Sequence, residues 1–479
     1  MSAQAPEQAD IVVVGAGSAG AVAAARLARE AGLRVVLLEA GPDFPSEAAD
    51  PPAFLVGGNL IGGAFTGAGA ATPDLDWGYW SEPVSGERRV RLHRGRLVGG
   101  SSMINGCVAV RAAPADFDRW VSLGARGWSW AEMLPFYERV EVDVPIRTYE
   151  RDAWQPFQHA FVAGFEELGF AWTPRINDPA SWGGVVGPWP QNRRNEIRHG
   201  TLVTHVRPAR ARANLTIVDR ALADRVLLDG ARAAGVRYLR GGRAHELRAG
   251  CVILSAGAYG SPAILQRSGI GPAGVLAAAG VQQLAELPVG EGLLDHPQTL
   301  LRASAPPALA RMSGPGFAVV ARGENYWAFP LPLDEDEGVV GVAFGLGVQE
   351  PRGSVRIAGA DPELAPLIDH RYRHVLDAGL FDRAWADFTA LCATAAWREA
   401  GIAPAEPEGL AGALRERLAT AFHPASSCAI GRVVDERLRV LGFEGLLVGD
   451  ASVFPDNTTN NPNLTCLAVG ERVAAFATA

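Results

Sequence analysis

Residues 10–20 read DIVVVGAGSAG, and this stretch decides the fold. The apolar run from Asp10 to Val14 is typical of a buried strand of a parallel sheet. An alanine-rich, helix-favouring segment follows to about Ala31, and a second apolar run covers residues 34–39. Strand, helix and strand in this order predict a βαβ unit, and the turn between its first strand and its helix holds three glycines in the pattern G-x-G-x-x-G.

Each glycine of this turn has its own task. Gly15 permits the tight turn, Gly17 lets the backbone approach a pyrophosphate, and Gly20 allows close helix packing. The phosphates are then expected at the helix N-terminus, beside Ser18 and Ala19. Glu39, followed by Ala40, ends the second strand, where its carboxylate can accept hydrogen bonds from ribose hydroxyls and would repel the 2′-phosphate of NADP. The motif predicts a dinucleotide and leaves FAD and NAD both open.

Composition excludes several classes of protein. The net charge of the 479 residues is −8 and no basic run stands out, so nothing indicates nucleic-acid binding. All 44 basic residues are arginine, which excludes a lysine Schiff base with pyridoxal phosphate. The chain is long enough for two interleaved lobes.

The five cysteines are widely spaced without a C-x-x-C motif, so we expect free thiols, no disulfide framework and no metal site. Neither a signal peptide nor a run of 18 apolar residues is visible, and we therefore expect a cytoplasmic protein without an integral membrane segment. The sequence says nothing of the oligomeric state.

The rest of the chain gives further expectations. Consecutive short apolar runs between residues 215 and 257 predict strands in antiparallel pairing, and residues 300–360 predict strands on a different surface. Helices are expected at residues 131–139, 377–397 and 465–476. Ser261-Pro262 suits the start of a helix, because serine is a good N-cap and proline fits the first turn.

Several segments resemble one family. Residues 95–105 (GRLVGGSSMIN) resemble the first signature of the glucose-methanol-choline (GMC) oxidoreductases, and residues 257–271 (GAYGSPAILQRSGIG) resemble the second. Residues 289–297 (VGEGLLDHP) resemble the next landmark of that family, and residues 448–452 (VGDAS) with 461–463 (NPN) resemble its C-terminal segment beside the flavin. The resemblance reaches from residue 10 to residue 479.

The resemblance implies a mixed α/β fold in two parts. A Rossmann-like FAD-binding domain of GMC type would comprise residues 1–150, 195–297 and 425–479, and an interleaved substrate-binding domain, an antiparallel sheet with helices, would comprise 151–194 and 298–424. Non-covalent FAD is expected, because Ile104 stands where some members attach the flavin through histidine. Small residues at 99–102 let the backbone pass a flat ring. Beyond the βαβ unit, the carried-over FAD contacts are Arg96, Val98, Gly99, Gly100, Ser102, Asn105, Gly106, Cys107, Val108, Ala223, Ala256, Gly257, Asp450, Ala451, Asn461 and Pro462.

The same resemblance implies a catalytic pair. Residues 422–431 (FHPASSCAIG) look like the segment with the family's active-site histidine, which makes His423 the acceptor of the hydroxyl proton as hydride passes to flavin N5. His296 matches a landmark that is read as structural. Asn461 falls at the place of the second catalytic residue, where it would hold the alcohol oxygen, although Asn460 and Asn463 are close enough to compete for this assignment.

The expected reaction is oxidation of a small-molecule alcohol. The short interval between His296 and Pro351 resembles the short bacterial GMC dehydrogenases, including the mycofactocin-associated type, so a quinone or another redox carrier is the expected electron acceptor. An alcohol oxidase that produces hydrogen peroxide is the alternative. A lyase or photodecarboxylase that keeps FAD on this fold, and a nicotinamide dehydrogenase, also stay open.

Overall fold

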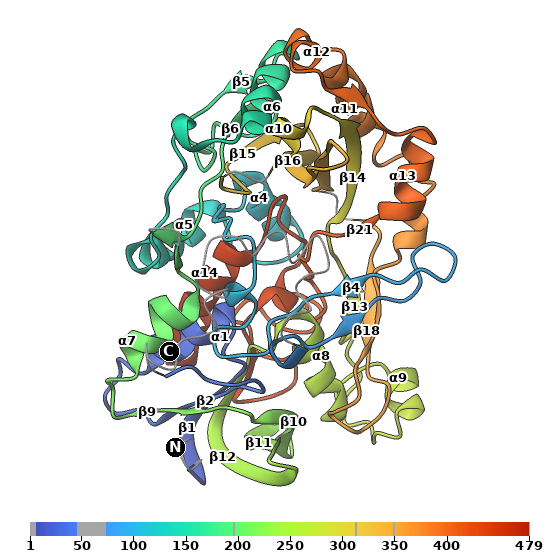
Figure 1. The fold of residues 1–479 in the computed structure, drawn as a ribbon. Coiled ribbons are helices and arrows are strands. Elements are labelled where there is room, and N and C mark those ends of the chain that lie inside the picture. Colours follow the sequence, from blue (N-terminus) through green and yellow to red (C-terminus); the bar gives the residue numbers. More distant parts are fainter. Residues whose placement is uncertain (1–5, 46–72, 195–196, 312–313, 348–349, 479) are drawn as a thin grey trace.

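The computed structural model describes residues 6–45, 73–194, 197–311, 314–347 and 350–478. Two large sheets lie at opposite ends of the molecule in the view of Figure 1, with helices between and around them. The mixed α/β architecture expected from the sequence is confirmed. Among the described helices, none is both long and apolar enough to cross a bilayer.

The first sheet carries the dinucleotide turn. Its strand order is β10-β11-β12-β1-β2-β9, with β22 also paired to β12. At its centre β1 pairs in parallel with β2 and with β12, as a βαβ unit requires. The bounds are β1 (Gln8–Val14), β2 (Val35–Leu38), β9 (Leu215–Val218), β10 (Leu222–Asp229), β11 (Arg232–Arg240), β12 (Arg243–Leu254) and β22 (Leu446–Val448).

The expected antiparallel pairing holds for β10, β11 and β12 but is wrong for β9. Residues 215–218 pair in parallel with β2. The error has a physical cause: a run of short strands resembles a meander, although β9 extends the parallel centre of the sheet and only the next strands fold back as hairpins.

Helix α1 (Ser18–Leu27) follows the glycine turn and packs against the C-terminal helix α14 (Asn463–Ala477). A Cβ at Gly470 would lie 2.4 Å from the Ala19 carbonyl oxygen, so only glycine permits this approach. The contact brings the residues just before α14 to the dinucleotide turn. Helix α1 ends before the expected Ala31, because residues 29–32 are exposed and no core packing holds another turn.

The second sheet lies near the top of Figure 1 among α6, α11, α12 and α13. Its order is β20-β14-β17-β16-β15-β6-β5, with β21 also paired to β14. Its strands are β5 (Ala171–Trp172), β6 (Val185–Pro188), β14 (Pro297–Ser304), β15 (Val319–Arg322), β16 (Tyr326–Asp334), β17 (Val339–Leu346), β20 (Ala403–Pro404) and β21 (Ala419–Thr420). The nearby helices are α6 (Pro156–Glu167), α10 (Pro307–Ala310), α11 (Asp382–Cys392), α12 (Ala395–Glu399) and α13 (Gly409–Arg417).

Two expected helices differ in detail. The helix predicted over 377–397 is divided into α11 and α12, because Thr394 leaves the helical conformation and accepts a hydrogen bond from the Trp397 amide as the N-cap of α12. Helix α8 (Gly257–Arg267) begins four residues before Ser261, so the capping explanation of Ser261-Pro262 is wrong. Ser261 instead donates a 2.6 Å hydrogen bond to Asp450.

Smaller elements complete the described chain. The helices are α4 (Pro114–Ser122), α5 (Trp130–Asp143), α7 (Arg207–Ala209) and α9 (Ala273–Ala278). The strands are β3 (Tyr79–Trp80), β4 (Arg91–Leu92), β7 (Arg193–Arg194), β8 (Ile197–Arg198), β13 (Glu291–Leu293), β18 (Gly353–Arg356) and β19 (Leu367–Asp369).

Separate apolar clusters surround the two sheets. The cluster around the first sheet includes buried side chains of α5 and α14, and two clusters pack on the second sheet. Tyr79 and Leu92, which the sequence assigns to the FAD-binding domain, pack in a cluster of the second sheet. The domain boundaries stay a prediction.

Candidate active site

The dinucleotide turn combines close packing with open space. Gly15 has φ +97°, and its amide donates a 2.8 Å hydrogen bond to the Leu38 carbonyl. A Cβ at Gly20 would lie 2.0 Å from the Gly15 carbonyl oxygen, whereas a Cβ at Gly17 would meet nothing within 4 Å. Two of the glycines therefore let backbone pack against backbone, and Gly17 borders an open volume at the start of α1.

That volume is a cavity of about 490 Å³. Its lining includes Ala223 and Arg267, Gly17, Gly257 and Asp450, and His423 and Asn461. Beside these, it is lined by Gly15, Ser18, Ala19, Glu39, Ala40, Arg96, Gly100, Asn105, Gly106, Val108, Ala256, Ala451 and Pro462. The fold thus brings segments from both ends of the chain to one space that borders a helix N-terminus, which fits a dinucleotide.

Five of the sequence-assigned cofactor residues do not line this cavity: Gly20, Val98, Gly99, Ser102 and Cys107. Ser102 is buried and hydrogen-bonds the Gly99 carbonyl and the Thr201 hydroxyl, so it holds the loop together. A Cβ at Gly100 would lie 2.7 Å from the Gly17 Cα. The small residues of this loop thus allow packing onto the dinucleotide turn.

Glu39 is buried with its carboxylate already engaged. Its oxygens accept hydrogen bonds from the amides of Ala16 (2.9 Å) and Gly41 (2.8 Å). Burial raises its pKa to about 7, opposed by these amides and by the Arg96 guanidinium. A hydroxyl donating to this carboxylate would lower the pKa again. Asp450 is held in a similar way, by the amides of Gly257 and Ser452 and by Ser261, with its pKa raised by burial.

Asn105 lies on the cavity wall with its oxygen tied back to the protein. Its Oδ1 accepts hydrogen bonds from the Cys107 amide (3.1 Å) and from Arg198 Nη1 (2.5 Å). The Asn105 Nδ2 is therefore the end of the amide that is left for a ligand in the cavity.

His423 lies on the wall of the cavity. Its amide donates to Asp295 (2.8 Å), its carbonyl accepts from Asn457 (2.9 Å), and its ring Nδ1 lies 3.0 Å from Nδ1 of His296. Burial lowers the pKa of His423 well below its usual value, and His296 and Arg94 add to the effect. The Nε2 atom has no hydrogen-bond partner among the described residues. The neutral imidazole can therefore offer this nitrogen to a ligand in the cavity.

Asp295, which the sequence reasoning passed over, is the centre of a buried polar cluster. It accepts hydrogen bonds from the amides of His296 and His423 and from the Thr420 hydroxyl. Its Oδ2 lies 3.3 Å from Nε2 of His370, which also contacts the Tyr259 hydroxyl on the cavity wall. The landmark at residues 289–297 therefore fixes the segment that carries His423.

The three asparagines before and at the start of α14 all line the cavity. Asn461 Nδ2 donates to the Val108 carbonyl (2.8 Å), which joins it to the loop that contains Asn105. Asn463 accepts from the Ser18 hydroxyl (2.8 Å), and the carbonyl of Asn460 accepts from Thr458. Asn463 thus lies beside the dinucleotide turn, and Asn461 keeps its assignment as the second catalytic residue as a prediction.

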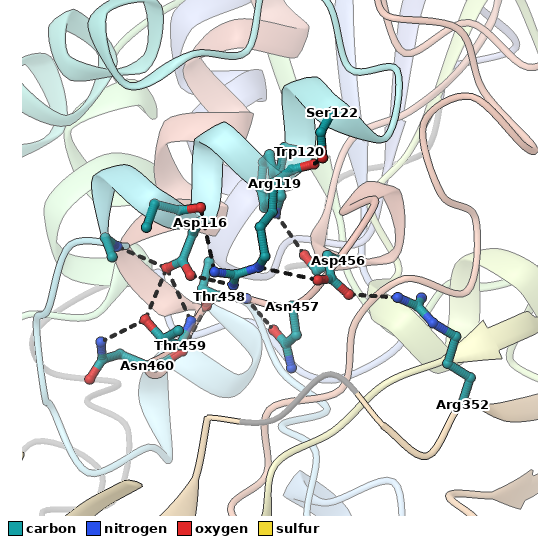
Figure 2. A network of polar contacts seen from close by, with 12 residues as sticks. Asp116, Arg119, Trp120, Ser122, Arg352, Asp456, Asn457, Thr458, Thr459 and Asn460 are labelled. Carbon is teal, nitrogen blue, oxygen red and sulfur yellow. Dashed lines mark hydrogen bonds and ion pairs between the residues drawn. The ribbon is translucent and has the colours of Figure 1, made fainter. Parts of the chain in front are cut away.

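A polar network holds the segment that carries these asparagines (Figure 2). Asp116, on α4, accepts from the Thr459 amide (3.0 Å) and pairs with Arg119 (2.6 Å). Asp456 pairs with Arg352 (2.6 Å), reaches Arg119 at 3.4 Å, and accepts from the Trp120 indole through its carbonyl. We refer to Asp116, Arg119, Arg352 and Asp456 as the anchor network.

The two cysteines near the site are unsuited to nucleophilic chemistry. Burial raises the pKa of the Cys428 and Cys466 thiols far above their usual value, with Asp450 adding to the shift. All five cysteines are free thiols.

Comparisons with known proteins agree with this arrangement. A family model described as GMC oxidoreductase matches residues 9–298, and a second one with the same description matches residues 349–470. A protein of Sinorhizobium medicae named oxygen-dependent choline dehydrogenase is 31% identical, over 98% of this chain and 95% of its own length. That alignment spans 535 positions, more than the 479 residues of this chain, so the relative is longer.

Solved structures show the same fold. Pyridoxine 4-oxidase from Mesorbium loti has a TM-score of 0.85 and 28% identity, with 97% of this chain and 98% of that chain covered. A formate oxidase of Aspergillus oryzae, studied for its FAD modification, has a TM-score of 0.86 and 21% identity, with 99% of each chain covered.

Proposed function

Because the chain belongs to the GMC oxidoreductase family and is thus an FAD-dependent enzyme acting on CH–OH donors, we propose that it is an alcohol dehydrogenase in which His423 accepts the substrate's hydroxyl proton. The single observation that carries this proposal is that a buried His423 lines the cavity with its Nε2 without a hydrogen-bond partner among the described residues. The FAD itself would be held non-covalently along the rest of the cavity.

The residues present fit this cofactor. Gly17 and Gly257 border open space where backbone amides can approach a pyrophosphate, and Glu39 offers lone pairs to ribose hydroxyls at the end of β2. Asn105 offers Nδ2 at the part of the cavity near Asn461. When bound, FAD supplies the acceptor for the hydride that leaves the carbinol carbon.

The protein side chains handle the proton and the orientation of the substrate. His423 takes the hydroxyl proton at Nε2, and the electron pair of the broken O–H bond becomes the second bond of the product carbonyl as the C–H bond is lost. Asn461 Nδ2 donates one hydrogen to the Val108 carbonyl, and its second hydrogen can be donated to the alcohol oxygen. Asn461 thus positions the substrate and takes no proton.

The proposal extends to the electron acceptor and the compartment. A dehydrogenase passing electrons to a quinone or another carrier is favoured by the short chain, and an oxidase that produces hydrogen peroxide is the alternative. The free thiols favour the cytoplasm. The lyase and photodecarboxylase alternatives receive no support, since the similar proteins are named as dehydrogenases and oxidases.

The experiment is anaerobic reduction of the bound flavin by an alcohol, followed through the bleaching of its visible absorbance. His423→Ala should slow reduction by roughly 10² to 10⁴ while the flavin spectrum of the oxidised protein is retained. Asn461→Ala should slow it less, because it removes one positioning hydrogen bond. Full retention of the rate in His423→Ala would refute the role of His423, and a larger loss in Asn461→Ala would reverse the ranking of the two residues.

A further inference from the structure

The cavity wall beside the catalytic pair is aromatic. Trp189, Phe317 and Phe329 pack on one another with ring centroids 4.9 to 5.5 Å apart, and Trp327 lies 5.9 Å from the His423 ring. All four line the cavity. A Cβ at Gly106 would lie 2.6 Å from Phe317, so this wall adjoins the loop that Asn461 contacts through Val108. A substrate held between His423 and Asn461 therefore meets aromatic rings.

The position of the Trp327 ring depends on Gly345 of the neighbouring strand. Gly345 on β17 pairs with Trp327 on β16 and with Gln298 on β14, so the three residues form one row across the sheet. A Cβ at Gly345 would lie 2.3 Å from the Trp327 ring, which shows that the indole lies across the glycine. The side-chain-free position in the middle of the row leaves an aromatic surface that extends from β16 over β17.

Gln298 supplies a polar group at this wall. Its side chain lines the cavity, the residue is 5% exposed, and its amide has no hydrogen-bond partner among the described residues. It stands two positions along the chain from His296, which contacts His423, and two residues of a strand span roughly 6.6 Å. This span is comparable to the width of one aromatic ring carrying a substituent at each end.

Carboxylates are absent from the aromatic part of the described cavity lining, and the cation there is Arg94, which donates a 2.6 Å hydrogen bond to the Phe422 carbonyl beside His423. The acidic lining residues are Glu39, Asp450 and Glu363. Glu39 is bound to the dinucleotide turn and Asp450 to the start of α8, and Glu363 is exposed outside the aromatic wall. The ring pairs of Trp189 with Phe317 and of Phe317 with Phe329 meet edge to face, so these rings cover one another instead of surrounding a single cation.

We propose, as a refinement that rests on the proposed function, that the substrate is an uncharged arylmethanol with a polar ring substituent. The ring packs against Trp327 and the aromatic wall, the carbinol group lies between His423 and Asn461, and Gln298 hydrogen-bonds the substituent. A buried amide left without its partner penalises an unsubstituted ring, so Gln298 determines specificity.

The test compares alcohols as reductants of the holoenzyme under anaerobic conditions. The rate of reduction divided by the apparent Kd should be highest for para-hydroxybenzyl alcohol, lower for benzyl alcohol, and at least roughly tenfold lower for choline and glucose. Gln298→Leu should reduce the preference for para-hydroxybenzyl over benzyl alcohol by roughly tenfold, and the Kd of para-hydroxybenzaldehyde, measured from its perturbation of the oxidised flavin spectrum, should rise by a similar factor. Gln283→Leu, at an exposed glutamine, is the matched control.

The outcomes separate the two proposals. Faster reduction by choline or glucose than by both benzyl alcohols, or an unchanged preference in Gln298→Leu, overturns the substrate class and leaves alcohol oxidation in place. A flavin that dithionite bleaches but that none of the alcohols reduces overturns both.

Discussion

The Nδ1 atoms of His423 and His296 lie 3.0 Å apart, so each imidazole fixes the tautomer of the other. One of the two nitrogens must carry a proton and the other must accept it. His423 can take a substrate proton at Nε2 only if its own proton is on Nδ1 and is donated to His296. His296 then carries its own proton on Nε2, a buried atom without a hydrogen-bond partner among the described residues.

His296 is therefore predicted to act as a positioning residue. Replacing it with Phe removes the acceptor for the His423 Nδ1 proton, and anaerobic reduction should slow by roughly tenfold or more while the apparent Kd of the alcohol changes little. His296→Gln, whose side-chain oxygen can accept the same proton, should recover part of the rate. Equal rates in the two variants would contradict this role.

The depressed pKa of His423 predicts a flat pH profile near neutrality. Because the folded protein keeps this imidazole neutral well below its usual pKa, the base is fully available at neutral pH and is lost only as the pH falls through the folded value. The rate of anaerobic reduction should be constant from about pH 8 down to about pH 6. A decline centred near the unperturbed histidine pKa would show that His423 is not the buried group described.

Stability should respond to acid through the same cluster. Burial lowers the pKa of His296 to about 4, so between that value and its usual pKa the unfolded chain binds more protons than the folded one. The free energy of unfolding is therefore unaffected above the unfolded pKa of His296. It falls as the pH drops below that value, by at most about 3 kcal/mol for this residue. Thermal unfolding of wild type and His296→Gln at neutral and acidic pH checks this, and the variant should lose less of its Tm in acid.

The anchor network is predicted to act through the segment before α14. Asp456→Asn removes the carboxylate that pairs with Arg352 and Arg119 and leaves Arg119 with Asp116. The loosened segment bears Asn457, which holds the His423 carbonyl, and Asn461. We expect the Tm to fall and the apparent Kd of the alcohol to rise several-fold. Glu436→Gln, which breaks the exposed pair with Arg126, should alter neither quantity.

How far the sequence predicts this protein depends on the range of the interactions. The glycine turn, the βαβ unit and the segment with His423 are encoded in short runs whose spacing has a direct physical meaning. The parallel pairing of β9 was missed, because its partner β2 lies some 180 residues earlier and no local pattern carries that pairing.

Contacts between distant segments explain the other differences. Ser102 hydrogen-bonds Thr201 and Gly99 packs against Leu202, so neither lines the cavity, and both contacts join segments about 100 residues apart. Gln298 and Trp327 lie in no motif, and Asp295 lies in the landmark at residues 289–297, where the sequence alone gives it no role. They become recognisable only when the second sheet places them beside His423.

Non-covalent binding of the flavin is a separate prediction. Ile104 lies in the cavity wall and has no nucleophilic atom for attachment. Precipitation of the holoenzyme with trichloroacetic acid should release all the yellow colour into the supernatant. Colour that stays in the pellet would mean that another residue forms a covalent bond to the cofactor.

The last prediction concerns the electron acceptor. The chain is shorter than its choline dehydrogenase relative, and this compactness, already noted between His296 and Pro351, favours a site that admits a docking acceptor. We expect photoreduced enzyme to reoxidise slowly in air-saturated buffer and to turn over rapidly with an artificial quinone or dye. Stopped-flow absorbance measures the first rate, and a peroxide assay measures the product. Rapid reoxidation with stoichiometric hydrogen peroxide would make the enzyme an oxidase, and it would leave the roles of His423 and Asn461 unchanged, since both act before the flavin is reoxidised.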